Sequence, residues 1–424
     1  MSFQNETKNH ILPTVNSPSH ILNALNNDCI QAIFRKFSNV GDFSSASKVC
    51  SKFYENAIVG YPPKFKNLDI GEDFGYDVTR IEHVKYFLMQ FGSFIKSIKF
   101  IGSTSKRRDN EIMKVISKFC GNTLKELIVE GRATVDLSSF QAIEELSILF
   151  SSVSGLQLRS QQLTRLELMG ECGGLNLGQH FSKLEQIDFT CCPITSDEFR
   201  CFLSYNPQLK YIKLTGCHGL TASNIEDIAY HTPNIVTLDL ENTLTDAINI
   251  NFRPFSKLRA LKYLAILDYS IDIASLDCLY RTLAENDVPL EILEVNCEAK
   301  NIMKLKHLKG LSIQEISAEK LIDFVKNVPK IEIITTPGFG IEKITVHDIK
   351  EILKHGKKLK FLDLGTIEIE YFDVSVFNDI AALAEGRTKV RIRLDQIIPE
   401  GIASRCHSEW LDMKERKYIH FLKG

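Results

Sequence analysis

Two pairs of neighbouring residues place a thiol beside an imidazole, the groups of a cysteine nucleophile and its base. Cys217 and His218 form one pair, and Cys406 and His407 form the other. Because adjacent side chains on a strand or a helix point in different directions, neither pair predicts an activated nucleophile. The sequence also lacks the G-x-x-x-x-G-K-[ST] phosphate loop, the G-x-S-x-G serine elbow and the H-E-x-x-H zinc helix. We therefore expect no enzyme activity, no cofactor and no bound metal.

Two short motifs could bind a phosphate or an acidic partner. The glycine-rich run from Gly170 to Gly174 follows an expected strand, and Lys106, Arg107 and Arg108 form a basic triplet of the kind found in nuclear-localisation signals. The glycines are also what a turn into the next element requires. We interpret the first motif as a turn and the second as a solvated loop before a helix.

Composition and charge narrow the class of protein. The 424 residues are 44% hydrophobic and 25% charged, as in globular proteins with a large core. Lys and Arg number 51 against 53 Asp and Glu, so no basic excess attracts nucleic acid or an anionic membrane. Residues 1–20 contain no apolar stretch of signal-peptide length, and no segment has the roughly 20 apolar residues that span a bilayer. We expect a cytoplasmic or nuclear protein that binds neither nucleic acid nor membrane.

A frame of the form apolar-x-x-apolar-x-apolar recurs about thirteen times along the chain. Its last three positions alternate as a half-buried strand requires, and helical spacing often follows, as at Ile225, Ile228 and Ala229. Successive frames begin about 18 to 30 residues apart. They start at Phe65, Ile95, Leu124, Ile143, Leu163, Leu184, Leu209, Ile235, Leu261, Leu290, Leu308, Ile331 and Leu359.

A strand and a helix in about 25 residues cannot bury both apolar faces alone, so the units must stack on one another. The pattern resembles the leucine-rich-repeat family from Phe65 to about Leu394. Two units resemble its cysteine-containing variant, through Leu214-Thr-Gly-Cys-His-Gly-Leu-Thr221 and Phe189-Thr-Cys-Cys-Pro-Ile-Thr195. The resemblance implies an α/β solenoid with parallel strands on the concave face and helices on the convex face.

Some repeats depart from this pattern. Thr243 stands where the variant has cysteine, and only about 20 residues separate Ile143 from Leu163. That spacing leaves room for a turn or a short helix. We therefore expect an irregular curvature.

The segment before the repeats carries two apolar stripes at helical spacing. The first contains Ile30, Ile33, Phe34 and Phe37, and can be capped by Asn26, Asn27 or Asp28. Asp42 offers a cap for the second, which contains Phe43, Ala46, Val49, Cys50, Phe53 and Ala57. We expect an all-α helical hairpin whose large apolar surface must be covered by the solenoid or by another protein.

This hairpin resembles the F-box over about Ala24 to Ala57, with Asn26 and Phe53 where the family usually has proline and tryptophan. The resemblance implies docking on the Skp-type adaptor, and through it on a cullin scaffold. The implied adaptor contacts are Leu25, Ile30, Ile33, Phe34, Phe37, Val49, Cys50 and Phe53. In the alternative interpretation the hairpin only caps the first repeat, since solenoids need a terminal cap.

Together these patterns predict four regions: a disordered tail over 1–20, an F-box over 21–60, a leucine-rich-repeat solenoid over 61–398 and a helical cap over 399–424. The cap is expected because Trp410, Leu411, Ile419 and Phe421 are mixed with charged residues. The two resemblances imply the substrate-recognition subunit of a Skp-cullin-F-box ubiquitin ligase, which holds a protein substrate near the ligase. The alternative is a ligase-independent intracellular scaffold or inhibitor.

A candidate substrate surface lies on the strands, because residues flanking the second apolar position of each frame point to the concave face. Acids outnumber bases at these positions, and apolar side chains gather in the later repeats. A partner would therefore present Lys or Arg beside an apolar group. The candidate residues are Glu167, Asp188, Tyr211, Asp239, Tyr263, Ile292, Glu294 and Phe361. A purely solvated acidic face is the alternative.

Overall fold

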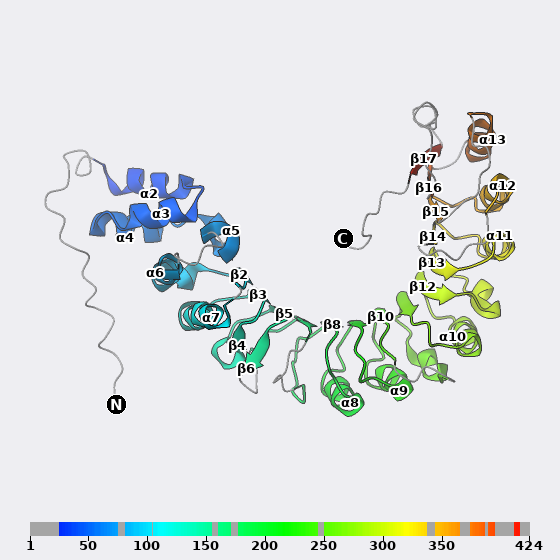
Figure 1. Cartoon of the computed structure of the whole chain (residues 1–424), viewed down its shortest axis with the longest axis horizontal. Helices are drawn as coiled ribbons and strands as arrows, with labels where there is room; N and C mark the ends of the chain where they lie inside the picture. Colours follow the sequence, from blue (N-terminus) through cyan, green and yellow to red (C-terminus); the bar gives the residue numbers. More distant parts are fainter. Residues whose placement is uncertain are drawn as a thin grey trace. The chain divides into compact units, whose positions relative to one another are not determined.

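The computed structural model describes residues 25–74, 81–103, 105–154, 160–170, 177–244, 250–336, 344–364, 374–385, 389–394 and 411–415. The chain divides into two compact units, Met1–Leu184 and Glu185–Gly424. Each unit contains a parallel sheet built from successive repeats, with helices between its strands (Figure 1). The predicted α/β leucine-rich-repeat fold with helices at the N-terminal end is thereby confirmed.

The first unit begins with α2 (Asn27–Lys36), α3 (Val40–Ser47) and α4 (Ser51–Val59). Its sheet has the order β1-β2-β3-β5-β7, formed by β1 (Asn67–Asp69), β2 (Ser97–Ile101), β3 (Glu126–Glu130), β5 (Glu145–Leu149) and β7 (Arg165–Met169). A separate small sheet pairs β4 (Thr134–Asp136) with β6 (Ser152–Ser154). The remaining elements are η1 (Pro63–Lys66), α5 (Ile70–Phe74), α6 (Ile81–Phe91), η3 (Gly92–Phe94), α7 (Lys106–Cys120) and η4 (Leu137–Ser139).

The second unit continues with strands in chain order, each pairing with the next. They are β8 (Gln186–Thr190), β9 (Tyr211–Thr215), β10 (Thr237–Glu241), β11 (Tyr263–Leu267), β12 (Ile292–Cys297), β13 (Gly310–Glu315), β14 (Ile333–Thr335), β15 (Phe361–Leu364), β16 (Val390–Leu394) and β17 (Leu411–Glu415). Between them lie α8 (Ser196–Tyr205), α9 (Ala222–His231), η5 (Arg253–Lys257), α10 (Ile273–Glu285), η6 (Lys300–Lys304), α11 (Ala318–Asn327), α12 (Val346–His355) and α13 (Val374–Ala384). Within this unit the strands line the inner side of an arc and the helices its outer side (Figure 1).

The apolar frames account for the strands and for the core beneath them. In β10, Leu238 and Leu240 are buried whereas Asp239 between them is half-buried, as a two-residue period requires. The helices begin where the sequence offers side-chain caps. Thr195 and Glu198 form a capping box at the start of α8, for example.

The position of the signature cysteine is a hydrogen-bonding position. Cys217 Sγ donates to the carbonyl oxygen of Phe189, 3.3 Å away in the preceding repeat. One repeat later, Thr243 Oγ1 donates to the carbonyl oxygen of Leu214 at 2.9 Å. Thr243 therefore replaces the cysteine without losing the bond between repeats.

Several local predictions need correction. The N-terminal segment has three helices instead of a hairpin, and Asn39 caps α3 in place of Asp42 because its side chain accepts from the Asp42 amide at 3.0 Å. The basic triplet is the first turn of α7, which begins at Lys106. In the short repeat after Ile143, β6 forms a strand that pairs with β4.

The predicted C-terminal helical cap is also contradicted where the structure describes it. Leu411–Glu415 forms β17, which pairs in parallel with β16. The run Leu-Asp-Met-Lys-Glu alternates between apolar and charged residues, which favours a strand over a helix. Residues 1–20, 399–410 and 416–424, the pair Cys406 and His407, and most of the glycine-rich run lie outside the described residues.

Candidate functional site: two protein-binding surfaces

The N-terminal helices are held together by polar side chains between α2 and α4. Asn26 caps α2 by accepting from the Cys29 amide at 2.8 Å. Asn56 Nδ2 donates to Asn27 Oδ1 at 3.2 Å, and Asn56 Oδ1 accepts from Gln31 Nε2 at 3.0 Å. Asn56 is buried, so these bonds fix how α4 lies against α2.

Aromatic rings join the three helices to the first repeat. The centroid of the Phe43 ring lies 5.3 Å from that of Phe34 in α2, 5.4 Å from that of Phe65 in η1 and 5.1 Å from that of Phe91 in α6. Most of these contacts are edge-to-face arrangements, which are favourable for aromatic pairs. The helices therefore cap the first repeat through Phe43, as the alternative interpretation of this segment required.

The eight residues predicted to contact an adaptor do not form one surface. Ile30 and Phe34 are each only 1% exposed, so they belong to the core of the helical unit. Leu25, Phe37, Cys50 and Phe53 are half-buried. Ile33 and Val49 are 48% and 47% exposed, and the structure adds Val59, which is 62% exposed at the end of α4.

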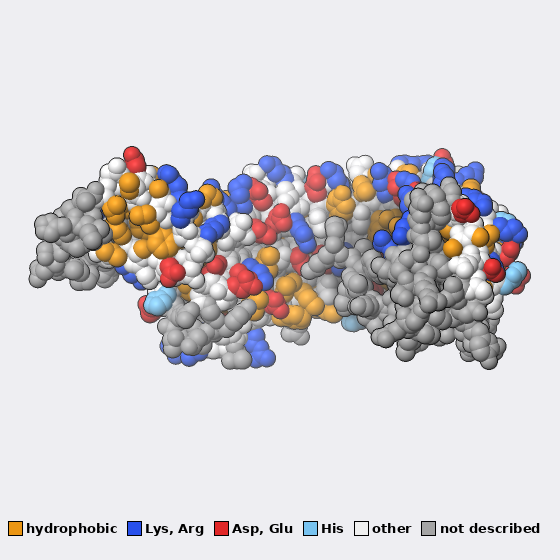
Figure 2. All heavy atoms as spheres, turned by 90° about the horizontal axis from the view of Figure 1, so that it is seen from above, with side chains coloured by type: hydrophobic (Ala, Val, Ile, Leu, Met, Phe, Trp, Pro, Cys, Tyr) orange, Lys and Arg blue, Asp and Glu red, His pale blue; other side chains and the backbone are white. Residues whose placement is uncertain are grey.

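The exposed apolar side chains of the three-helix segment make up the first candidate surface, which we call the helical surface (Ile33, Val49 and Val59), although Val49 precedes α4 and Val59 ends it. Hydrophobic side chains gather over α2–α4 in Figure 2. The core below them is already filled by Phe34 and Phe43, so these residues are not needed to close the unit. Apolar side chains that the fold itself does not cover are candidates for contact with another protein.

The second candidate surface consists of two rows that cross the sheet of the second unit. The strand register aligns an apolar row of Tyr211, Thr237, Tyr263, Ile292, Gly310, Ile333 and Phe361. It aligns a parallel acidic row of Asp188, Lys213, Asp239, Ala265 and Glu294. Seven of the eight predicted substrate residues lie in these rows. The apolar row also contains Ile333, which is exposed and was not among the predicted substrate residues.

Glu167 is the predicted substrate residue that lies elsewhere. It belongs to β7 in the first unit. Its Oε2 accepts from Ser147 Oγ at 2.8 Å and lies 3.3 Å from Arg165 Nη2. Its charge is therefore already balanced by neighbours of its own unit.

The carboxylates of the acidic row are only partly balanced. Lys213 Nζ lies 3.5 Å from Asp188 Oδ2, so these two charges form an ion pair. Burial, together with Glu294 and other acids, raises the pKa of Asp239 to about 7, although Lys213 acts in the opposite direction. Burial also raises the pKa of Glu294, whose Oε1 accepts a hydrogen bond from Tyr263 Oη at 2.8 Å. A cation from a partner would relieve this excess of negative charge.

Two observations bear on metal binding and on the candidate thiol in the part of the chain that the structure describes. No group of three or more His, Cys, Asp or Glu lies close enough there to hold a metal ion. Cys217 is fully buried, and its thiol donates to a backbone carbonyl, which makes it a packing residue of the repeat. None of the described helices has the length and apolarity to cross a membrane.

Comparisons with known proteins give a distant structural likeness. No protein-family model matches the chain, and no match to a curated protein is found. The chain is similar to the crystal structure of the Rad7 and Elc1 complex from yeast, with 14% sequence identity and a TM-score of 0.43. The matched region covers 91% of this chain and 86% of that chain. At this level of similarity, the partners of this chain have to be inferred from its own surfaces.

Proposed function

We propose that the chain is a non-catalytic receptor that connects a protein substrate to a Skp-cullin-F-box ubiquitin ligase. The helical surface binds the Skp-type adaptor, and the two rows on the second unit bind the substrate. The observation that carries the proposal is the exposure of Ile33 and Val49 on a helical unit whose own core is closed by Phe34. The F-box resemblance of the same segment supplies the class of partner.

The size of the exposed surface limits what it contributes alone. Full burial of a Val or Ile side chain contributes roughly 1.5 to 3 kcal/mol, and these side chains are already about half covered. The helical surface therefore provides roughly 3 kcal/mol in total. Stable binding also needs the half-buried neighbours Phe37 and Phe53, which lie on the same helices.

The substrate follows from the chemistry of the two rows. An excess of carboxylates beside exposed Tyr211, Ile292 and Ile333 fits a segment that presents Lys or Arg next to an apolar side chain. A phosphorylated motif would instead require a cluster of arginines. The receptor therefore selects basic and apolar segments.

A second candidate function is a ligase-independent scaffold, in which the three helices serve only as the cap of the solenoid. The packing of Phe43 against Phe65 and Phe91 favours this candidate. It does not explain why Ile33 and Val49 remain exposed. The two functions differ in whether the chain binds the adaptor.

The test measures, by calorimetry, the binding of purified Skp-type adaptor to the full chain and to the double variant Ile33→Asp, Val49→Asp. We expect binding to the parent chain and a loss of at least about a hundredfold in the double variant, since each substitution removes apolar burial and also places a charge in the interface. Met89→Asp is the matched control, because Met89 is similarly exposed but lies on α6. Equal binding by both variants, or no binding by the parent chain, would reject the ligase function.

A further inference from the structure

The layer of helices in the second unit is interrupted between α10 and α11. These helices have 13 and 10 residues, whereas η6 between them has only 5. The sequence gives the reason, because the frames at Leu290 and Leu308 are the most closely spaced in this unit. The chain between β12 and β13 is therefore too short to form a full helix.

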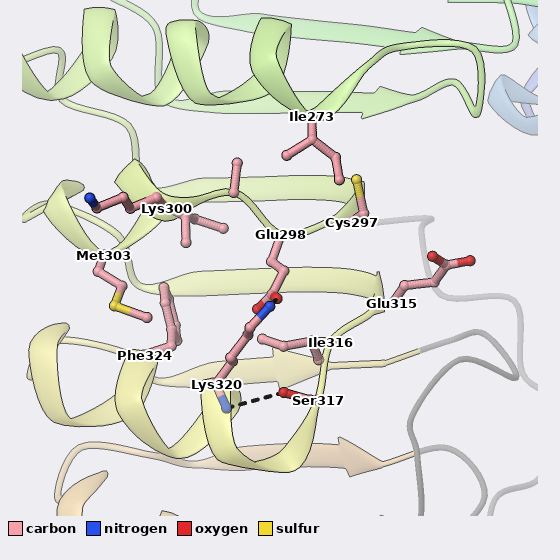
Figure 3. A pocket seen from close by; sticks show the side chains of 12 residues that line it. Ile273, Cys297, Glu298, Lys300, Met303, Glu315, Ile316, Ser317, Lys320 and Phe324 are labelled. Carbon is pink, nitrogen blue, oxygen red and sulfur yellow. Dashed lines mark hydrogen bonds and ion pairs between the residues drawn. The ribbon is translucent and has the colours of Figure 1, made fainter.

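A groove of about 640 Å³ lies at this interruption (Figure 3). Ile273 from α10, Met303 from η6 and Phe324 from α11 contribute to its lining. Ile273 is the first residue of α10 and is 62% exposed. Of these three side chains, Ile273 and Met303 are accessible from the groove, whereas Phe324 is fully buried behind them.

The charges in the groove are arranged unevenly. The ammonium of Lys320 forms an ion pair with Glu298, and Figure 3 shows these two side chains meeting in the middle of the groove. Lys300 and Glu315 are exposed, and neither forms an ion pair with another residue in the described ranges. In Figure 3, Lys300 lies with Met303 on one side, and Glu315 lies beyond Cys297 on the opposite side. The groove therefore has a basic end and an acidic end.

We propose that this groove binds one amphipathic helix of a partner protein, aligned with α10 and α11. The N-terminus of a helix carries partial positive charge and its C-terminus partial negative charge. The bound helix therefore places its N-terminus near Glu315 and its C-terminus near Lys300. Its neighbour α11 runs the same way, since it begins at Ala318, shortly after Glu315.

The partner helix has a definite sequence pattern. Its apolar residues recur at i, i+3, i+4 and i+7, so that one stripe faces Ile273 and Met303. A carboxylate in its last turn pairs with Lys300, and a basic side chain in its first turn pairs with Glu315. This site shares no residue with the helical surface or the two rows, so it does not depend on the proposed ligase function.

The test uses two synthetic peptides of about 14 residues, long enough to span about 20 Å as helices. Both carry the same leucine stripe and the same composition. One has lysines in the first turn and glutamates in the last, and the other has these charges exchanged. Fluorescence polarisation measures their binding to the full chain. We expect the first peptide to bind at least about tenfold more tightly, and Ile273→Arg to weaken it at least about tenfold.

Two further variants make the result specific. Tyr230→Arg is the matched control, because Tyr230 is similarly exposed on α9 and does not line the groove, and it should leave binding unchanged. The exchange Lys300→Glu with Glu315→Lys should reverse the preference between the peptides. Equal binding of both peptides, unchanged binding by Ile273→Arg, or no binding of either peptide would overturn the proposal.

Two other occupants can be recognised in the same experiments. If deletion of residues 1–24 raises peptide affinity, the groove is covered by the N-terminal segment of the chain. If sedimentation shows a dimer that Ile273→Arg dissociates, the groove is an interface between two copies. Either result would overturn the assignment to a partner helix.

Discussion

The charge of Asp239 should make the chain less stable as the pH rises towards neutrality. Its carboxyl group lies in the acidic row, where burial is the largest of several effects that together raise the pKa from 3.8 to about 7. Glu294 on β12, Glu241 on β10 and Asp188 on β8 also raise this pKa, whereas Lys213 on β9 lowers it. The folded chain therefore binds the Asp239 proton more tightly than the unfolded chain does.

The sign and size of the effect follow from these two pKa values. The unfolded chain loses the Asp239 proton near pH 3.8 and the folded chain only near pH 7. Between these values unfolding releases a proton, so the free energy of unfolding falls as the pH rises. Since one pKa unit corresponds to about 1.4 kcal/mol, the loss between about pH 5.5 and pH 7.5 amounts to about 2 kcal/mol.

Urea unfolding followed by circular dichroism at pH 5.5, 6.5 and 7.5 measures this loss. The free energy of unfolding of the parent chain minus that of Asp239→Asn should fall by about 2 kcal/mol across the series. The comparison removes the contribution of groups that titrate independently of Asp239. Asp197→Asn is the control, since the Asp197 side chain is 92% exposed. If the difference in free energy of unfolding between the parent chain and Asp239→Asn stays constant with pH, the raised pKa of Asp239 is refuted.

Three further substitutions test the packing by urea unfolding. Leu238→Ala should cost about 2 to 5 kcal/mol, because the side chain is fully buried; a cost below about 1 kcal/mol would place it outside the core. Phe34→Ala should destabilise the chain by about 3 to 5 kcal/mol, whereas Ile33→Ala should cost far less because its side chain is half exposed. Equal costs would reverse this assignment. Thr243→Val should cost about 1 kcal/mol through the lost bond to the carbonyl of Leu214, and an unchanged stability would show that this bond contributes nothing.

The strands of the solenoid could be predicted from the sequence because a two-residue period leaves a direct mark on it. Every predicted frame lies at a strand, and the register of the strands places the predicted acids and aromatics in rows. The bond made by Thr243 could be anticipated only as a departure from the cysteine pattern. Its equivalence to Cys217 depends on the position of a carbonyl in the neighbouring repeat.

The surfaces were harder to predict because burial depends on the partner element. Ile30, Ile33 and Phe34 share one helical stripe, yet only Ile33 is exposed, since Phe43 and Phe53 pack around the Phe34 ring. The same stripe therefore contains both core and surface residues. The groove had a visible cause in the close spacing of Leu290 and Leu308, but its apolar lining comes from three separate elements.

Hydrogen exchange of the full chain with and without purified Skp-type adaptor tests the receptor function most directly. The account predicts slower exchange in Asn27–Lys36 and Ser51–Val59, the helices that carry the exposed residues Ile33 and Val59. It predicts unchanged exchange in the strands that carry the acidic row, such as Thr237–Glu241. Unchanged exchange in both helices at saturating adaptor, or protection confined to the strands, would contradict the proposed docking.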